Sequence, residues 1–374
     1  MLPIKKPLLL VLMIFFSLFG YGQKEKKEGI FRDTLDGKFD ASSWLADYHG
    51  FLPVIMPITE PAVDYGIGAG LIFLHRNKKY PKQPPGMSAI GGGYTFNNSW
   101  MLFLFHRNHY LNDRIRYTGA LGYADVNLNF YRKILDRELR ANMNLNAPLL
   151  FQQLMFRIPK TRLFLGGFFL TSNLESKFNE TNLGDVFQGW SRTFKTGSLT
   201  AKTFWDSRDN TFTPNKGIYA IAEYGFHENW LGSEFVYKDA NFRAYMYGHW
   251  LAKVVFGLRV QTDNVIGDDV PYFAKPFLSM RGMPAMRYQG SNTLLFETEE
   301  RWDFNPRWSM VGFVGTGKAM EGYNELNFDD WKWAGGAGIR YLMARWFNFY
   351  GGFDLAAGEE GFAFYVTVGS NWGR

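Results

Sequence analysis

The chain has 374 residues, no cysteine and a formal net charge of +6. The lack of cysteine excludes disulfides, thiolate metal sites and cysteine nucleophiles. Aromatic residues make up 18% of the sequence and 40 residues are glycine, yet the mean hydropathy is only -0.22. This combination is typical of many amphipathic strands with aromatic bands. No interior stretch approaches the roughly 18 consecutive apolar residues that a spanning helix needs.

The N-terminus has the pattern of a secretory signal peptide. Two lysines precede an apolar run at residues 8–19, and small and turn-forming residues follow it. We therefore expect export, with cleavage between Gly22 and Gln23, so that residues 1–22 are a signal peptide.

Residues 23–62 are expected to form a periplasmic N-terminal segment. Its first part is rich in Lys and Glu and favours a flexible leader. The stretch from residue 36 to 52 is apolar enough to pack on a larger body, but it is too short to fold as a domain. We predict that this stretch docks on the rest of the chain, residues 63–374.

From Tyr65 onward the sequence predicts strands of about ten residues separated by turns. In Gly361 to Trp372, apolar residues alternate with small and polar ones, which is typical of a membrane strand. Trp331, Trp333 and Trp372 are interpreted as anchors at the membrane surface. We expect sixteen strands, with approximate cores at 64–75, 87–96, 99–109, 114–122, 125–133, 148–158, 161–172, 197–207, 217–227, 233–246, 249–262, 290–304, 307–317, 330–341, 346–356 and 361–372.

Short and long connections alternate along these strands, as in an up-and-down barrel with short periplasmic turns and long external loops. On this count the connections 75–86 and 265–290 are external, 97–98 is periplasmic, and both termini are periplasmic. The predicted strands 114–122 and 125–133 could alternatively be one long strand, which would change the parity. The fold class is therefore all-β: a sixteen-stranded antiparallel transmembrane barrel of the outer membrane over residues 63–374.

The segment from Val265 to Gly290 contains the tetrad Met280, Arg281, Gly282 and Met283. Its prolines and aspartates exclude a strand interior or a helix, and connections this long are usually functional or disordered. Gly282 permits a tight tip from which Arg281 projects. The lumen is a candidate destination for this loop and also for the 36–52 stretch.

Two arrangements of Arg281 are open. Period-two alternation places carboxylates on the lumen face, and pairing of Arg281 with one of them would pin the loop inside. The first candidates are Glu299 and Asp354, and Glu297 and Arg301, on the same face as Glu299, are the further predicted lumen partners of the loop. Alternatively, Arg281 lies in external water and these carboxylates pair across strands with Arg301 and Arg340.

Several stretches resemble the BamA/TamA superfamily of outer-membrane barrels, which includes the bacterial surface antigen family. Residues 280–283 occupy the place of an aliphatic-Arg-Gly-aromatic tetrad in the family's sixth external loop. The stretch 299–301 resembles the family's Glu-x-Arg strand, and 335–341 and 353–356 resemble its last glycine-rich and Asp-bearing strands. The stretch 58–66 is similar to the first-strand entry of a Bacteroidetes-type branch. The family's Asp-x-Arg-Asp…Pro…Gly periplasmic turn is matched by Asp206, Arg208, Asp209, Pro214 and Gly217.

The chain departs from the family pattern at three points. Met283 stands where an aromatic residue normally follows the Arg-Gly pair. Gly315 stands where the family places an inward Asp, which removes one expected acidic partner of the loop. The family's insertases carry periplasmic domains before the barrel, and residues 23–62 are too few for one, so we expect a barrel-only member.

The resemblance implies a role in outer-membrane protein assembly, insertion or translocation. The partners that it implies are client barrel proteins, periplasmic chaperones or lipoproteins, beside outer-membrane lipid and lipopolysaccharide. In the family the first and last strands form a weak seam, and the glycine-rich stretch 65–70, taken as the first strand, suits a seam or equally a curved barrel wall. The alternative function is a passive porin-like channel or a structural outer-membrane protein.

The sequence gives little support to an enzyme. It has no His-Glu-x-x-His zinc motif and no Gly-x-Ser-x-Gly elbow, so no catalytic residue, metal site or cofactor is expected. We interpret Asp206, Arg208 and Asp209 as a turn held by side-chain hydrogen bonds rather than as acid–base residues. The dispersed basic residues give no indication of nucleic-acid binding.

Overall fold

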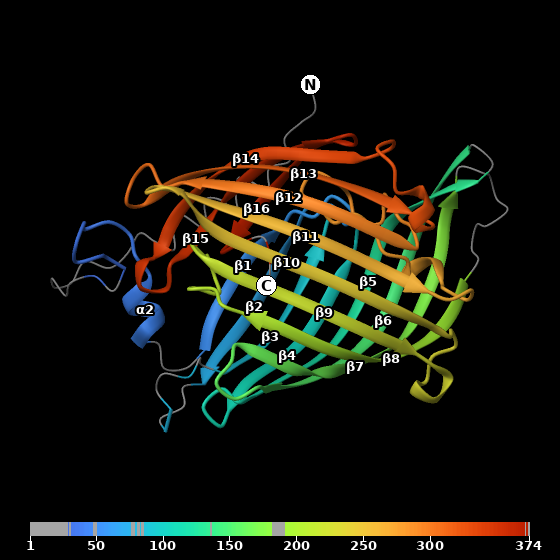
Figure 1. The fold of residues 1–374 in the computed structure, drawn as a ribbon, viewed down its shortest axis with the longest axis horizontal. Coiled ribbons are helices and arrows are strands. Elements are labelled where there is room, and N and C mark those ends of the chain that lie inside the picture. Colours follow the sequence, from blue (N-terminus) through green and yellow to red (C-terminus); the bar gives the residue numbers. More distant parts are fainter. Residues whose placement is uncertain are drawn as a thin grey trace.

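The computed structural model describes residues 29, 31–47, 51–75, 79–80, 83, 86–134, 137–181, 191–370 and 372, and the predicted signal peptide lies outside them. It is an all-β barrel of sixteen strands (Figure 1). The strands are β1 (Phe51–Ile58), β2 (Gly66–His75), β3 (Gly86–Thr95), β4 (Trp100–Tyr110), β5 (Ile115–Ile134), β6 (Arg137–Arg157), β7 (Leu163–Thr181), β8 (Ser191–Asp206), β9 (Gly217–His227), β10 (Tyr237–Leu251), β11 (Val254–Ile266), β12 (Asn292–Trp302), β13 (Trp308–Met320), β14 (Lys332–Ala344), β15 (Phe349–Gly358) and β16 (Gly361–Val368).

The helical elements are short. One α-helix, α2 (Ser42–Asp47), precedes the first strand. In the described part of the chain, no helix is long and apolar enough to cross a membrane. The remaining elements are single 3-10 turns in the connections, namely η2 (Asn229–Leu231), η3 (Tyr272–Ala274), η4 (Tyr323–Glu325) and η5 (Arg345–Phe347).

Each strand pairs antiparallel with its neighbours in chain order, from β1 to β16. Successive connections therefore lie at opposite ends of the barrel. We call the end that carries residues 267–291 the loop rim, and the end that carries residues 207–216, 303–307 and 345–348 the turn rim. β1 begins and β16 ends at the turn rim, so both ends of the sheet lie on the side that the sequence predicts to be periplasmic.

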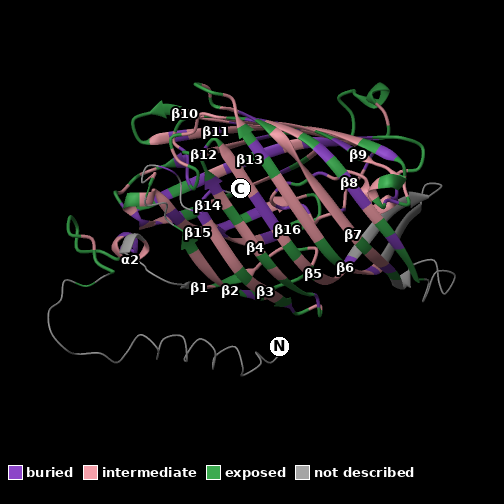
Figure 2. Cartoon of the chain, turned by 90° about the horizontal axis from the view of Figure 1, so that it is seen from below, coloured by how far each residue is buried: buried purple, intermediate pink, exposed green. Residues whose placement is uncertain are grey.

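The strand faces show why this chain forms a membrane barrel. Along β13 the side chains alternate between exposed and buried, and Figure 2 shows the same alternation on neighbouring strands. Large apolar side chains such as Leu104 and Leu355 are exposed on the outside. Charged side chains such as Arg340 and Asp354 are instead buried inside. An apolar exterior around a polar interior is the pattern of a barrel in lipid.

The predicted number of strands is right, but only because two errors in the predicted strand positions compensate for each other. Residues 114–122 and 125–133 form one strand, β5, which is the alternative that the sequence left open. The first strand, β1, lies at residues 51–58, inside the segment assigned to the periplasm. The barrel therefore begins twelve residues before the predicted boundary at 63, counting from 51.

These two errors also misplace connections. Because β1 precedes β2, the connection 76–85 lies at the turn rim and 96–99 lies at the loop rim, the reverse of the prediction. The glycine-rich stretch 65–70 is not at the edge of the sheet, since β2 pairs with both β1 and β3. Its glycines instead allow close approach within the wall: a Cβ on Gly70 would lie 2.9 Å from the carbonyl oxygen of Ile90.

The sheet does not close by a ladder, since the described strands β1 and β16 form no paired register. Thr59 follows β1 directly, and its Oγ1 accepts a hydrogen bond of 3.2 Å from the backbone N–H of Val366, near the end of β16. The two edge strands are thus staggered, because the loop-rim end of β1 lies beside the turn-rim end of β16. We call this junction the seam.

Two prolines in β1 contribute to the open seam. β1 pairs with β2 along its whole length, and backbone N–H groups alternate between the two edges of a strand. A proline directed at β2 would cost a ladder bond, so Pro53 and Pro57, an even number apart, face the free edge. Of the four positions 51, 53, 55 and 57 on that edge, only Phe51 and Ile55 retain a donor. This edge is therefore poorly suited to pair with another strand.

The seam suggests a test with the variant Pro53→Val/Pro57→Val. The substitutions restore two N–H donors to the free edge of β1, and each new hydrogen bond contributes about 0.5–1.5 kcal/mol. We expect more edge-to-edge dimers in detergent, measured by light scattering after size exclusion. Pro148→Val, in the doubly paired strand β6, is the control and should not change the dimer fraction. Equal dimer fractions in all three proteins would show that the prolines do not protect this edge.

Candidate functional site: the lumen loop and its ion pairs

The connection between β11 and β12, residues 267–291, folds into the barrel, and we call it the lumen loop. On one side, Leu278, Met280 and Met283 are buried in a cluster with Leu295 of β12 and Ala334 of β14. On the other side, the lumen loop packs against a different part of the wall through Met286, which is buried with Leu128 of β5 and Met143 of β6. The lumen loop therefore spans the barrel interior.

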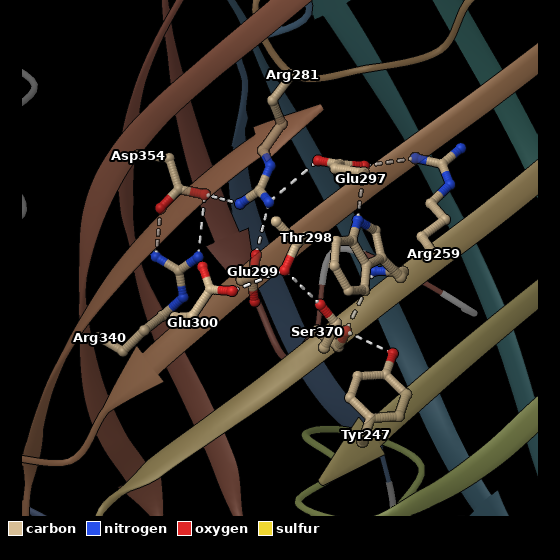
Figure 3. A network of polar contacts seen from close by, with 12 residues as sticks. Tyr247, Arg259, Arg281, Glu297, Thr298, Glu299, Glu300, Arg340, Asp354 and Ser370 are labelled. Carbon is tan, nitrogen blue, oxygen red and sulfur yellow. Dashed lines mark hydrogen bonds and ion pairs between the residues drawn. The ribbon is translucent and has the colours of Figure 1, made fainter. Parts of the chain in front are cut away.

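Arg281 lies at the centre of an ion-pair cluster (Figure 3). Its Nη1 is 2.8 Å from Oδ2 of Asp354, and its Nη2 is 2.6 Å from Oε2 of Glu299 and 3.3 Å from Oε1 of Glu297. The guanidinium also stacks on Phe313, with Cζ 3.5 Å from the ring centroid. Only 8% of the Arg281 side chain is exposed. The structure thus places the loop arginine inside the barrel, in contact with all three acidic residues named from the sequence.

Two further arginines complete the cluster. Arg340 of β14 binds both carboxylate oxygens of Asp354, at 2.5 and 3.0 Å. Arg259 of β11 lies 3.0 Å from Oε2 of Glu297. The three arginines 259, 281 and 340 face the three carboxylates 297, 299 and 354, so the formal charges balance. This balance matters because an unpaired buried charge is far more costly than a paired one.

The fourth predicted partner, Arg301, does not contact the lumen loop. Its Nε is 2.9 Å from Oδ1 of Asp303, and its Nη2 donates to Asn215 in the turn between β8 and β9. Both arrangements that the sequence left open are therefore partly realised: Arg281 pairs with carboxylates inside the barrel, while Arg340 pairs across strands with Asp354. Arg301 instead binds residues near the turn rim.

Gly315, where the resemblance led us to expect Asp, is explained by the size of Met280. A Cβ on Gly315 would lie 2.8 Å from Sδ of Met280 and 3.1 Å from Cγ of Glu297. The missing side chain thus leaves space for the apolar flank of the tetrad. The acidic partner that Gly315 does not supply is replaced by Glu297, which faces it directly across the β12–β13 ladder.

The tip of the lumen loop reaches both sides of the seam. Gly282 has φ +93° and its backbone N–H donates to the hydroxyl of Tyr365 in β16, at 2.9 Å. Glu60, in the turn after β1, lines one cavity together with Met283 and Ala285 of the lumen loop and Tyr365 of β16. The loop therefore bridges the two edge strands although they lack a ladder.

The predicted periplasmic turn is held by its own side chains. Arg208 binds Asp206 through Nε and Nη2, both at 2.9 Å, and stacks on Tyr219. Asp209 accepts the backbone N–H of Asn215 at 2.9 Å. A Cβ on Gly217, at φ +108°, would clash with the carbonyl oxygen of Ser207. These contacts describe a turn that is held by side-chain hydrogen bonds and an ion pair.

Pro214 and the C-terminal tail meet at the turn rim. Pro214 lines a small cavity with Arg301, Arg340 and Ser370. β16 ends at Val368, four residues before the predicted end, and Gly369 turns the chain at φ +74°. Trp372 consequently lies inside the barrel, 4% exposed, with its Nε1 donating to Glu297 at 2.9 Å. Trp372 is therefore not a membrane-surface anchor, contrary to the prediction.

No protein-family model matches the sequence, and no curated protein matches it. Among solved structures, BamA from Haemophilus ducreyi lacking POTRA domains 1–3 is similar, with a TM-score of 0.56, 11% identity, and coverage of 85% of this chain and 69% of that chain. CdiB from Acinetobacter baumannii has a TM-score of 0.55 and 12% identity over 85% of this chain and 59% of that chain. CdiB from Escherichia coli has a TM-score of 0.55 and 12% identity over 84% of this chain and 61% of that chain.

These likenesses define the fold of the chain. It is a sixteen-stranded barrel of the outer-membrane type, and its architecture is that of the BamA and CdiB barrels. The chain spans about three fifths of the length of the two CdiB chains.

The cluster predicts a strong effect of Arg281→Ala. The substitution leaves three carboxylates with two cations, and loss of one partner of a buried pair costs about 3–5 kcal/mol. We expect a lower unfolding temperature and faster cleavage of the lumen loop by proteinase K.

Lys275→Ala is the matched control for Arg281→Ala. It removes a cation of the same loop whose ion pair with Glu321 is more exposed, for an expected cost of about 0–1 kcal/mol. If Arg281→Ala behaved like Lys275→Ala in both measurements, the ion pairs would not hold the loop.

The contact between Gly315 and Met280 predicts coupled effects. Gly315→Asp should destabilise the barrel by about 1–3 kcal/mol through overpacking. Adding Met280→Ala frees the space beside residue 315. The double variant should therefore lose less stability than the two single variants lose in sum. Unfolding in denaturant, followed by tryptophan fluorescence, measures both. Gly312→Ala, where an added Cβ meets nothing within 4 Å, is the control. Strictly additive losses would refute the coupling.

Proposed function

We propose that this chain is an outer-membrane protein that assists the insertion or translocation of other proteins. The observation that carries the proposal is the seam: two staggered edge strands without a ladder, bridged by the tip of the lumen loop. A closed ladder is the usual requirement for a strand wall in lipid, because unpaired backbone groups are costly there. A wall that lacks it at one place is suited to open at that place.

The content of the lumen also supports this proposal over a passive channel. The lumen loop spans the interior, and the 207–216 turn and Trp372 occupy the turn-rim end. A cavity of about 550 Å³ lies between the β9–β11 wall and the lumen loop. A porin needs a continuous aqueous path, and the presence of the lumen loop, the 207–216 turn and Trp372 inside the barrel argues against one. The structural likeness to BamA and CdiB also favours the proposed function over a passive channel.

The proposed location is the outer membrane, reached through a signal peptide cleaved after residue 22. The apolar exterior of the barrel supports a lipid environment, and the partners that we propose are membrane lipid, client barrel proteins and periplasmic chaperones or lipoproteins. We propose no enzymatic activity.

Conductance in planar bilayers tests the proposal. The purified wild-type barrel should be nearly closed, with brief fluctuating openings. A variant lacking Asp268 to Gly290 removes the segment that spans the lumen and should open a large, stable pore. A variant lacking residues 323–326, an exposed part of another loop at the same rim, is the control and should conduct like wild type.

A steady wild-type conductance equal to that of the deletion would instead favour the alternative, a passive porin-like channel. Co-purification of client barrel proteins with the wild type would add direct support for an assembly role, because a passive channel has no reason to retain them.

A further inference from the structure

The segment before β1 is bound to the turn rim by a buried arginine. Arg307, in the turn between β12 and β13, is 1% exposed. Its Nη1 lies 2.6 Å from Oδ2 of Asp40, its Nε lies 2.7 Å from Oδ2 of Asp36, and its Nη2 contacts Asp33. Arg345, in the turn between β14 and β15, adds a contact of 3.0 Å with Asp36. Two arginines of the barrel thus bind three aspartates of one short segment.

Backbone contacts fix this segment in register. The N–H of Ala41 donates to the carbonyl of Met343 at 2.7 Å, and the N–H of Trp346 donates to Oγ of Ser42 at 3.0 Å. The hydroxyl of Tyr341 donates to the carbonyl of Phe39 at 2.9 Å. The described residues 31–47 are therefore bound to a specific site at the turn rim, and not in the lumen, which was a candidate destination for 36–52.

The binding site of this segment and strand β1 lie on opposite sides of the seam. Only residues 48–50 separate α2 from the start of β1, one edge strand of the seam. The turns that bind the segment belong to β12–β15, on the side of the other edge strand, β16. Figures 1 and 2 both show α2 beside the turn-rim end of β15. The chain is therefore anchored on both sides of the seam at the turn rim, by this segment on one side and by β1 on the other.

We propose that residues 31–47 are a clasp that holds the seam closed from the turn rim. β1 cannot rely on a ladder with β16, so its position relative to that strand depends on the contacts at either end. At one end these are Thr59 with Val366 and the tip of the lumen loop; at the other end it is the clasp. Release of the clasp frees the start of β1 and lets the seam widen.

The electrostatics of the clasp favour a docked state at neutral pH. The hydrogen bond from Arg307 lowers the pKa of Asp36 well below its ordinary value of 3.8. For Asp40, burial acts to raise the pKa, but the hydrogen bonds from Ser42 and Arg307 outweigh burial and lower it. Both carboxylates are thus anionic when docked, and replacing Arg307 leaves them without their main partner.

The chain has no cysteine, so introduced cysteines report on single positions. Ser42→Cys measures docking, because Ser42 is 3% exposed in the clasp and its thiol should react with a maleimide only after release. Spin labels at Ile55→Cys and Leu355→Cys, both exposed on the outer face of β1 and β15, measure the width of the seam by pulsed electron paramagnetic resonance.

Two variants release the clasp from opposite sides. Arg307→Gln removes the barrel partner of the clasp. Asp33→Asn/Asp36→Asn/Asp40→Asn removes the charges of the clasp and leaves the barrel sequence intact. This aspartate variant tests the proposal even if Arg307→Gln does not fold. Each should raise the maleimide rate of Ser42→Cys by at least about tenfold. Each should also shift the distance between the labels at 55 and 355 to longer, broader values.

Arg162→Gln is the control, since Arg162 lies exposed at the same rim and its Nη1 contacts the carbonyl of Ser207. It should change neither readout. The proposal is overturned if Ser42→Cys stays protected in the aspartate variant, or if it becomes reactive while the distance between the labels is unchanged. The inference does not depend on the proposed function, because a porin with this seam would give the same result.

Discussion

The carboxylate of Asp354 is the constraint on which the interior depends. It is 0% exposed and is shared between Arg340 of the wall and Arg281 of the lumen loop. A group buried to this extent must have its charge matched, so the wall and the loop are each incomplete without the other. The neighbouring strand is adapted to it: a Cβ on Gly338, the cross-strand partner of Asp354, would clash with Oδ1 of that carboxylate. Gly338 of β14 thus makes room for the ion pair of Asp354.

Much of this site could be predicted from alternation alone. Because neighbouring strand residues face opposite sides, the sequence placed Glu297, Glu299 and Asp354 on the lumen face, and the structure has them there. Alternation predicts which face of the sheet a side chain lies on, but not how deeply it is buried or which residue it contacts. It could not decide between Arg281 and Arg340 as partners of Asp354, and the structure uses both. It also could not show that Met280 needs the space beside Gly315, since that contact joins a loop to a distant strand.

The edges of the sheet were the least predictable part of the fold. Pro53 and Pro57 argue against a strand in the sequence, yet an edge strand tolerates them because one side of its backbone is unpaired. At the other edge, the alternation of 361–372 continues past the true end of β16, and only the pair Gly369 and Ser370 hints at a turn. Periodicity describes strands between two neighbours well, and a seam is where that condition fails. The seam is held instead by side chains and loop contacts, which leave no periodic signal.

The clasp joins positions that are very distant in the chain, since Asp33 and Arg307 are 274 residues apart. The clasp is made first during synthesis, whereas its binding site requires the turns between β12 and β15. An unfinished barrel therefore has a free acidic N-terminal segment, and a finished one does not. The docked clasp is in this sense a mark of completion: it can form only when nearly all of the wall is present, so its acidic residues distinguish a folding intermediate from the mature protein.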